Sequence, residues 1–166
     1  MKEINPVDLT VKAVDLWMNQ WLLLTAGDQD DFNMMTVAWG SIGCMWSKPF
    51  VQIVVRPQRY TYQYMEKYDT FTLCAFPPKY HKDLKRLGTI SGRDGNKIKR
   101  TALTIRQSQK VKAPAYNEAS LILECKTIYF QDMDAEGFID KSIINNYPKK
   151  DFHRIYFAEI LTALVS

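Results

Sequence analysis

The chain has 166 residues and a mass of 19.3 kDa, so we expect a single domain over residues 1–166. Hydrophobic residues make up 46% and charged residues 24%, a composition that excludes a disordered chain. The net charge of +4 is too small to indicate nucleic-acid binding by itself. No apolar segment approaches the length needed to span a bilayer.

Six segments have the apolar, β-branched and aromatic composition of strands, and turn signals bound most of them. In chain order these segments are 21–27, 33–39, 50–55, 70–76, 120–130 and 152–165. The last two are long enough to bend around a barrel.

Helix-like spacing occurs between the predicted strands. Tyrosines recur every fourth residue over 60–68, and Leu84 and Leu87 are three residues apart, so each set shares one helix face. A third short helix is expected over 94–103. Because strands and helices do not alternate regularly and GxGxxG is absent, a parallel nucleotide-binding sheet is not indicated. The pattern favours a mainly β chain with inserted helices, folded as an antiparallel barrel.

The charged residues are distributed unevenly. Eleven lysines and arginines but only two acids lie between Lys79 and Lys112. This run fits either a solvated helical face or a basic rim that attracts phosphorylated cofactors, and the sequence leaves both open. The acidic stretch over 132–140 is expected to be a surface loop.

Cys44, Cys74 and Cys125 are widely spaced and include no CxxC pair, so neither a zinc site nor a disulfide framework is indicated. With these cysteines and two histidines, we expect no metal site. The segment 1–14 mixes charges of both signs and lacks the features of a signal peptide. We therefore expect a cytoplasmic protein with reduced thiols.

The stretch NMMTVAWG over 33–40, the WSKP over 46–49 and the RPQRYT over 56–61 place small, hydroxyl-bearing and cationic residues after apolar runs. This layout suits a flat, partly apolar ligand that carries a phosphate. A helix starting near Arg59 would offer free N–H groups, and Arg59 and Thr61 would add a charged and a hydroxyl donor. Alternatively, Thr61 only caps the helix and Arg59 is a surface cation.

These segments resemble the flavin reductase-like family, whose members share the FMN-binding split barrel, and particularly its flavoredoxin-like branch. The motifs that carry the resemblance are, in order, NMMTVAWGSIG, MWSKP, VRPQRYTYQYMEK, FTLCAF, SGRDGNK, EASLILECKTIYFQD and DFHRIYFAEI. The resemblance implies a six-stranded antiparallel Greek-key barrel and a homodimer with FMN near the dimer interface. It also implies NAD(P)H as the electron donor.

The resemblance assigns a site to this chain. The segment 33–39 is similar to the strand that runs along the isoalloxazine ring, and 44–48 matches the next part of the wall. The phosphate-binding turn falls within 56–61, and a second loop within 91–97 closes over the phosphate or ribityl chain. The implied cofactor-binding residues are Asn33, Met35, Thr36, Val37, Ala38, Trp39, Cys44, Met45, Trp46, Ser47, Lys48, Arg56, Arg59, Tyr60, Thr61, Ser91 and Lys97.

Five side chains keep more than one role open or depart from the family pattern. Trp39 and Trp46 either contact the ring or belong to the core. Cys44 stands where related sequences often have an aliphatic residue, and it either tunes the flavin or packs. Arg93 faces solvent or reaches the nicotinamide nucleotide. His153 is expected to be structural, because the flavin itself carries out the hydride chemistry.

The expected function is that of an FMN-binding oxidoreductase, in which NAD(P)H reduces the flavin and the flavin passes electrons to free flavin or another acceptor. One alternative is a flavoredoxin-like electron carrier without its own NAD(P)H site, acting with a redox protein partner. Another is a nucleic-acid-binding barrel that uses the basic run and surface aromatics. We expect that neither nucleic acid nor a membrane is a partner of this protein.

Overall fold

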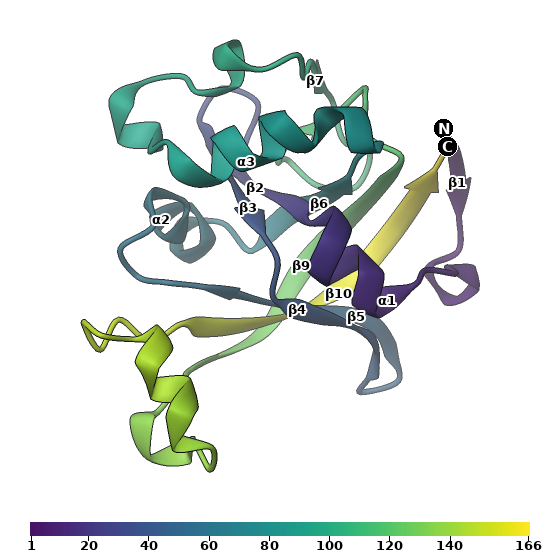
Figure 1. Cartoon of the computed structure of the whole chain (residues 1–166). Coiled ribbons are helices and arrows are strands. Elements are labelled where there is room, and N and C mark those ends of the chain that lie inside the picture. The colour runs from purple at the N-terminus through teal and green to yellow at the C-terminus, as the bar shows by residue number, and fades with distance from the viewer.

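In the computed structural model, which describes residues 1–166, one antiparallel sheet curls around the core (Figure 1). Its strands are β1 (Lys2–Ile4), β2 (Leu22–Gly27), β3 (Phe32–Val37), β4 (Gly40–Met45), β5 (Lys48–Val55), β6 (Thr70–Ala75), β9 (Leu121–Asp132) and β10 (Arg154–Val165). They pair in the order β3-β2-β6-β9-β10-β5-β4, and β1 pairs with β10. All six predicted strands are present, and the expectation of a mainly β fold with a few helices is confirmed.

The sheet is not closed, and β3 and β4 are its two edges. These strands are consecutive in the sequence and are separated only by Ala38 and Trp39, so the chain crosses the seam of the split barrel at these two residues. Because β3 pairs only with β2, the backbone groups on its other side have no strand partner.

The two longest strands, β9 and β10, shift register between Phe157 and Ala158 and again between Ile160 and Thr162. Bulges of this kind bend a strand and increase its twist, which lets one sheet enclose a core. Fully buried side chains from five strands fill the inside, including Leu22, Leu24, Ile53, Leu73 and Leu123.

A second apolar cluster lies on the opposite face of β2, β3, β6 and β9. Helix α3 (His81–Thr89) covers this face with Leu84 and Leu87, which pack with Leu23 and Met34. Because β2 is covered on both faces, all six of its residues are buried. Helix α2 (Tyr60–Lys67) packs against β2 and β3, while α1 (Ala13–Asp15) and the π-turn η2 (Leu16–Gln20) precede the sheet. The tyrosine and leucine spacings therefore predicted two real helices.

The prediction of a third helix over 94–103 is wrong. The chain forms two separate 3-10 turns there, η4 (Gly92–Asp94) and η5 (Ile98–Arg100). Gly95 lies between them with φ of +106°, a conformation that a helix cannot continue through.

The sequence missed β4 and the short strands β1, β7 (Ile105–Arg106) and β8 (Ala115–Tyr116). The β4–β5 hairpin turns at Trp46 and Ser47, which have φ of +52° and +58°. Two-residue hairpin loops with positive φ normally carry asparagine or glycine, so this turn gives no sequence signal.

The segment 133–153 between β9 and β10 forms a lobe that projects from the sheet (yellow-green in Figure 1). It contains the 3-10 turns η6 (Ala135–Gly137) and η7 (Lys141–Asn146). Most of the acidic stretch lies in this lobe, as expected for a surface loop. No helix anywhere in the chain has both the length and the apolar character required to cross a membrane.

Candidate functional site

Two adjoining cavities lie beside the edge strand β3, and Met35, Arg56 and Arg59 line both of them. The first, which we call the polar cavity, has a volume of about 350 Å³ and lies between the start of α2 and the segment 87–97. The second, the seam cavity, has a volume of about 200 Å³ and is lined by 35–39 together with Val54 and His153.

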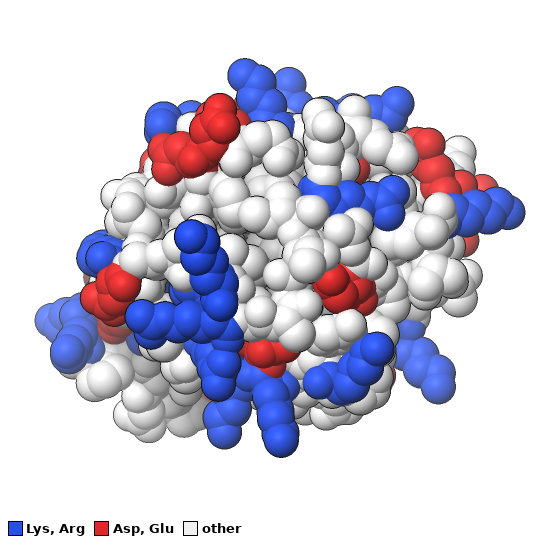
Figure 2. All heavy atoms as spheres, turned by 90° about the horizontal axis from the view of Figure 1, so that it is seen from above, with Lys and Arg blue, Asp and Glu red and all other residues white.

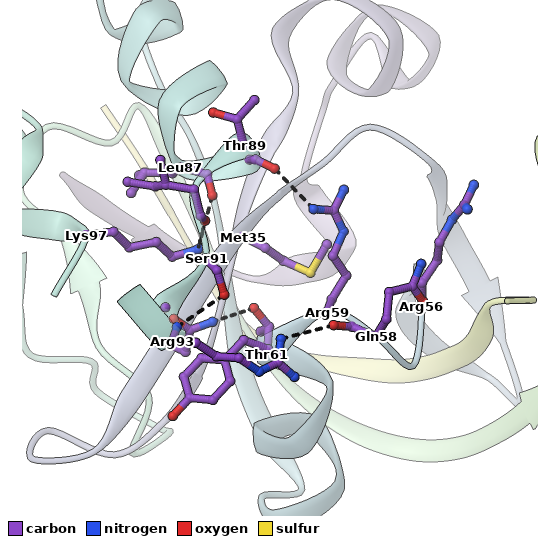
Figure 3. A pocket seen from close by; sticks show the side chains of 15 residues that line it. Met35, Arg56, Gln58, Arg59, Thr61, Leu87, Thr89, Ser91, Arg93 and Lys97 are labelled. Carbon is purple, nitrogen blue, oxygen red and sulfur yellow. Dashed lines mark hydrogen bonds between the residues drawn. The ribbon is translucent and has the colours of Figure 1, made fainter. Parts of the chain in front are cut away.

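Three cations reach the polar cavity from different elements: Arg59, Arg93 and Lys97 (Figure 3). None of them takes part in an ion pair. They donate only to backbone carbonyl oxygens: Arg59 to Gly88 at 3.3 Å, Arg93 to Gln58 at 3.2 Å, and Lys97 to Leu87 at 3.1 Å and Ile90 at 3.3 Å. Their positive charges are therefore uncompensated, and the cavity favours an anion.

Lys97 is the most constrained of these cations because it is only 5% exposed. Burial and the nearby Arg59 lower the pKa of Lys97 to about 8. The carbonyl oxygens that hold its ammonium belong to the last turn of α3 and the residue after it, where the helix dipole favours a cation.

Helix α2 begins at the floor of the polar cavity. Arg59 is its extended N-cap residue, so the free N–H groups of the first turn start here. The buried Asn33 amide donates to the Thr61 hydroxyl at 2.7 Å, which leaves the hydroxyl proton available as a donor. Gly92 approaches the Asn33 side chain and the Tyr60 ring so closely that a Cβ would overlap both. A larger residue at 92 would therefore displace the Asn33 side chain or the Tyr60 ring.

Arg56 differs from the other cations. It forms an ion pair with Asp151 at 2.8 Å, donates to the Asn146 carbonyl at 2.9 Å and lies 4.9 Å from the Tyr147 ring centroid. The hydrogen bond from Arg56 lowers the pKa of Asp151, which stays ionised. Arg56 was predicted on the phosphate-binding turn, but its charge is compensated and it attaches the 133–153 lobe.

The seam cavity combines apolar walls with backbone groups of the unpaired β3 edge. Trp39 is half exposed, and its ring centroid lies 5.4 Å from that of His153. Trp39 is therefore not a core tryptophan. Trp46 is 58% exposed at the β4–β5 turn, so it does not belong to the core either.

His153 is buried, and its Nδ1 lies 2.8 Å from the Tyr147 hydroxyl. Burial, reinforced by the charge of Arg56, lowers the pKa of His153 to about 4, so the imidazole is neutral at pH 7. The sequence predicted a structural histidine, whereas the structure also places its ring in the cavity wall.

Twelve of the seventeen predicted site residues line the two cavities; their contact with a cofactor stays a prediction. They are Asn33, Met35, Thr36, Val37, Ala38, Trp39, Arg56, Arg59, Tyr60, Thr61, Ser91 and Lys97.

The other five predicted residues, Cys44, Met45, Trp46, Ser47 and Lys48, line neither cavity. They form the turn end of the β4–β5 hairpin. In the sheet order, β4 is the edge strand at the end opposite β3. Within one chain these five residues therefore lie apart from the two cavities, and their contact with a cofactor stays a prediction. Cys44 is exposed, and Lys48 forms an ion pair with Glu159 at 2.8 Å.

The sequence missed several cavity residues. The last turn of α3 contributes Gly88 and Thr89. They line the cavity because of the path that the backbone takes there, and no sequence pattern predicts that path. Arg93 belonged to the SGRDGNK motif, and the sequence left open whether it faces solvent or reaches the nicotinamide nucleotide. Its guanidinium lies 5.1 Å from the Tyr60 ring centroid and lines the polar cavity.

Comparison with known proteins identifies the class. The model of the flavin reductase like domain matches residues 18–163, and the chain belongs to this family. Two similar relatives are uncharacterized proteins of Archaeoglobus fulgidus and Pyrococcus abyssi. The first is 29% identical over 58% of this chain and 54% of its own length, so the chain spans about half of it. The second is 28% identical over 78% of this chain and 74% of its own.

Solved structures agree on the fold. An FMN-binding domain of a flavin reductases-like enzyme from Shewanella baltica has a TM-score of 0.70 at 20% identity, over 98% of this chain and 75% of its own. Flavoredoxin of Desulfovibrio vulgaris has a TM-score of 0.70 at 21% identity, over 95% and 74%. An NADH:FAD oxidoreductase from Streptomyces globisporus, in complex with NAD and FAD fragments, has a TM-score of 0.67 at 16% identity, over 89% and 75%.

The pKa of Lys97 predicts a pH dependence of stability. Between pH 8 and 10.5 the unfolded chain keeps the lysine proton and the folded chain loses it, so the free energy of unfolding rises with pH through this interval. We expect the difference in stability between the natural protein and Lys97→Met to increase in favour of the natural protein over this range. Denaturant unfolding at several pH values measures it, and a pH-independent difference would contradict the lowered pKa.

Proposed function

We propose that the two cavities together hold FMN, with its phosphate in the polar cavity and its ring system in the seam cavity. The observation that carries this proposal is the group of three uncompensated cations, Arg59, Arg93 and Lys97, beside an apolar cavity at an unpaired strand edge. A phosphate matches these cations and the first turn of α2. The backbone of 35–38 matches the polar edge of a flavin ring.

Bound FMN would supply the redox chemistry, accepting a hydride and passing electrons to an acceptor. The residues of this chain would bind and orient it. Arg59 and Lys97 would hold the phosphate, the Thr61 hydroxyl would donate to it, and the β3 edge would fix the ring. The neutral His153 would add no charge beside the ring.

We further propose that NAD(P)H is the electron donor, so that the protein is a flavin reductase. Arg93 supports this proposal, because it is an exposed, uncompensated cation at the mouth of the polar cavity, where a second nucleotide would approach. The named neighbours include both an NADH:FAD oxidoreductase and a flavoredoxin. Either activity is compatible with the fold.

The alternative is an electron carrier that receives electrons from a redox protein. Figure 2 looks onto the side that bears α3, where lysines and arginines are more frequent than acids. None of the eleven cations between Lys79 and Lys112 takes part in an ion pair, so this side would suit an acidic partner.

Anaerobic titration of the FMN-loaded protein separates these activities. A reductase is expected to lose its flavin absorbance within seconds of adding NADH or NADPH, because the donor binds next to the ring. The nucleotide that bleaches the flavin faster is the preferred donor. Bleaching by dithionite but by neither nucleotide would exclude the reductase and favour the carrier. A protein that binds no FMN would exclude both.

The phosphate anchor predicts a selective loss of affinity. A charged hydrogen bond contributes about 1.5–3 kcal/mol, so Arg59→Ala should weaken FMN binding roughly ten- to hundredfold. Riboflavin lacks the phosphate, and its affinity should stay nearly unchanged. Lys97→Ala should show the same selectivity with a smaller loss, because an ammonium holds a phosphate less geometrically than a guanidinium. Flavin fluorescence titration measures both ligands.

Lys85→Ala is the matched control, since Lys85 lies on α3 but lines neither cavity. It removes one charge from the same side of the molecule and should leave both affinities unchanged. An equal loss for FMN and riboflavin in Arg59→Ala would mean that Arg59 supports the fold or the ring cavity, and the phosphate assignment would fail.

We also propose a homodimer. The outer face of β9 and β10 carries aromatic side chains in mutual contact, including Tyr129 and Phe157 with ring centroids 5.7 Å apart, and Trp46 extends this face. Trp46 is 58% and Tyr129 45% exposed in the single chain, so a second copy would bury a contiguous apolar surface.

In such a dimer the hairpin residues 44–48 of one copy would approach the cavities of the other. We therefore expect FMN to slow alkylation of Cys44, the only exposed thiol, and to leave Cys74 and Cys125 unaffected. Light scattering on the FMN-loaded protein should give twice the 19.3 kDa of one chain. A monomer that binds FMN fully would contradict the dimer.

A further inference from the structure

The 133–153 lobe contributes to the wall of the seam cavity through its last residue, His153. Tyr147 of the lobe is 3% exposed, and its hydroxyl lies 2.8 Å from His153 Nδ1. His153 is 8% exposed, lines the seam cavity and stacks at an angle against Trp39. The lobe therefore reaches the cavity by way of the imidazole.

The hydroxyl proton of Tyr147 has two acceptors within reach. His153 Nδ1 lies at 2.8 Å, and the thioether sulfur of Met133 lies at 3.5 Å. A thioether is a weak acceptor and the imidazole nitrogen is a strong one. Burial raises the pKa of Tyr147, so the phenol keeps its proton, and we expect it to donate that proton to the stronger acceptor, Nδ1.

This donation determines where the imidazole carries its own proton. His153 is neutral at pH 7, because burial and Arg56 lower its pKa to about 4, and a neutral imidazole has one N–H group. When Nδ1 accepts from Tyr147, that proton lies on Nε2. Nε2 has no hydrogen-bond partner in the chain. It is not one of the buried polar atoms that lack a partner, so it is accessible to a ligand.

The position of the Tyr147 ring is fixed from several sides. The Arg56 guanidinium lies 4.9 Å from its centroid, Phe152 packs at 4.9 Å and Phe138 at 5.8 Å. Arg56 is itself held by Asp151, so the hydroxyl is aimed at Nδ1 by a packed aromatic and ionic cluster.

We propose that Tyr147 is a positioning residue that holds His153 as the Nε2–H tautomer, so that the seam cavity presents one neutral hydrogen-bond donor to a carbonyl oxygen of its ligand. Both the ring carbonyls of a flavin and the carboxamide of a nicotinamide provide such an oxygen. The identity of the ligand rests on the proposed function. The tautomer is a property of the protein without ligand, so the two are tested separately.

Nitrogen NMR of the ¹⁵N-labelled, ligand-free protein at pH 7 tests the tautomer directly. The chain has only two histidines, so His81→Gln leaves the imidazole of His153 as the single signal. We expect a protonated, pyrrole-type Nε2 and an unprotonated, pyridine-type Nδ1. In Tyr147→Phe, which keeps the ring and removes the hydroxyl, both nitrogens should shift toward averaged values as the two tautomers mix.

Tyr68→Phe is the control, because its hydroxyl donates to Asp28 at 2.9 Å and contacts neither cavity. It should leave the His153 signals unchanged. A proton on Nδ1 in the natural protein would overturn the proposal whether or not Tyr147→Phe folds. Unchanged His153 signals in a folded Tyr147→Phe protein would overturn it as well.

Two ligand additions identify the source of the carbonyl. A change in the Nε2–H signal on adding FMN alone indicates a flavin carbonyl, and a change only on adding NAD⁺ to the FMN-loaded protein indicates a nicotinamide. The affinity for that ligand should then fall about two- to tenfold in Tyr147→Phe, the value of one neutral hydrogen bond. If neither ligand changes the signal although FMN binds, His153 is not a ligand donor and the proposal is wrong.

Discussion

The antiparallel pairing of β9 with β10 is the contact on which the rest of the structure depends. It joins the part of the sheet formed by β6, β2 and β3 to the part formed by β5 and β4. Its two register shifts bend the sheet into an open barrel. The turn after β5 then arrives beside the free edge of β3, which is why Arg56 and Arg59 meet Met35 although they are distant in the sheet order.

Packing on the second face of the sheet positions the other half of the polar cavity. Leu84 and Leu87 hold α3 over β2 and β3, and this packing sets the position in space of the C-terminal end of α3. The carbonyl oxygens near that end hold Lys97. The packing of α3 on the sheet therefore also positions the Lys97 ammonium, because a shift of α3 would move the carbonyl oxygens that hold it. The short distance between Gly92 and the Asn33 side chain shows how closely the following turn approaches β3.

The sequence predicted the six long strands and two helices because their hydrophobic spacing is set by burial, which local residue patterns report. It missed β4 because Trp46 and Ser47 occupy positive-φ positions without the usual turn residues. It predicted one helix over 94–103 because the pattern does not report the backbone break at Gly95.

In the candidate site, Arg59, Thr61 and Lys97 were found from residue type and family resemblance, and all three line the polar cavity. Two features of the site could not be predicted because they depend on contacts between distant segments. The charge of Arg56 is compensated by Asp151, 95 positions away, and the position of His153 in a cavity wall depends on the course of β3. The local sequence predicts neither the ion pair of Arg56 nor the position of His153.

With the proposed ligand in the polar cavity, the uncompensated, buried ammonium of Lys97 would also link ligand supply to the amount of folded protein. A buried charge without a counter-ion lowers the stability of the ligand-free chain, and a dianion bound in the polar cavity would relieve that cost. A ligand at one hundred times its dissociation constant adds about 2.7 kcal/mol to the free energy of unfolding. In a cell, molecules that fail to acquire their ligand would be degraded first, so the ligand-loaded form would accumulate.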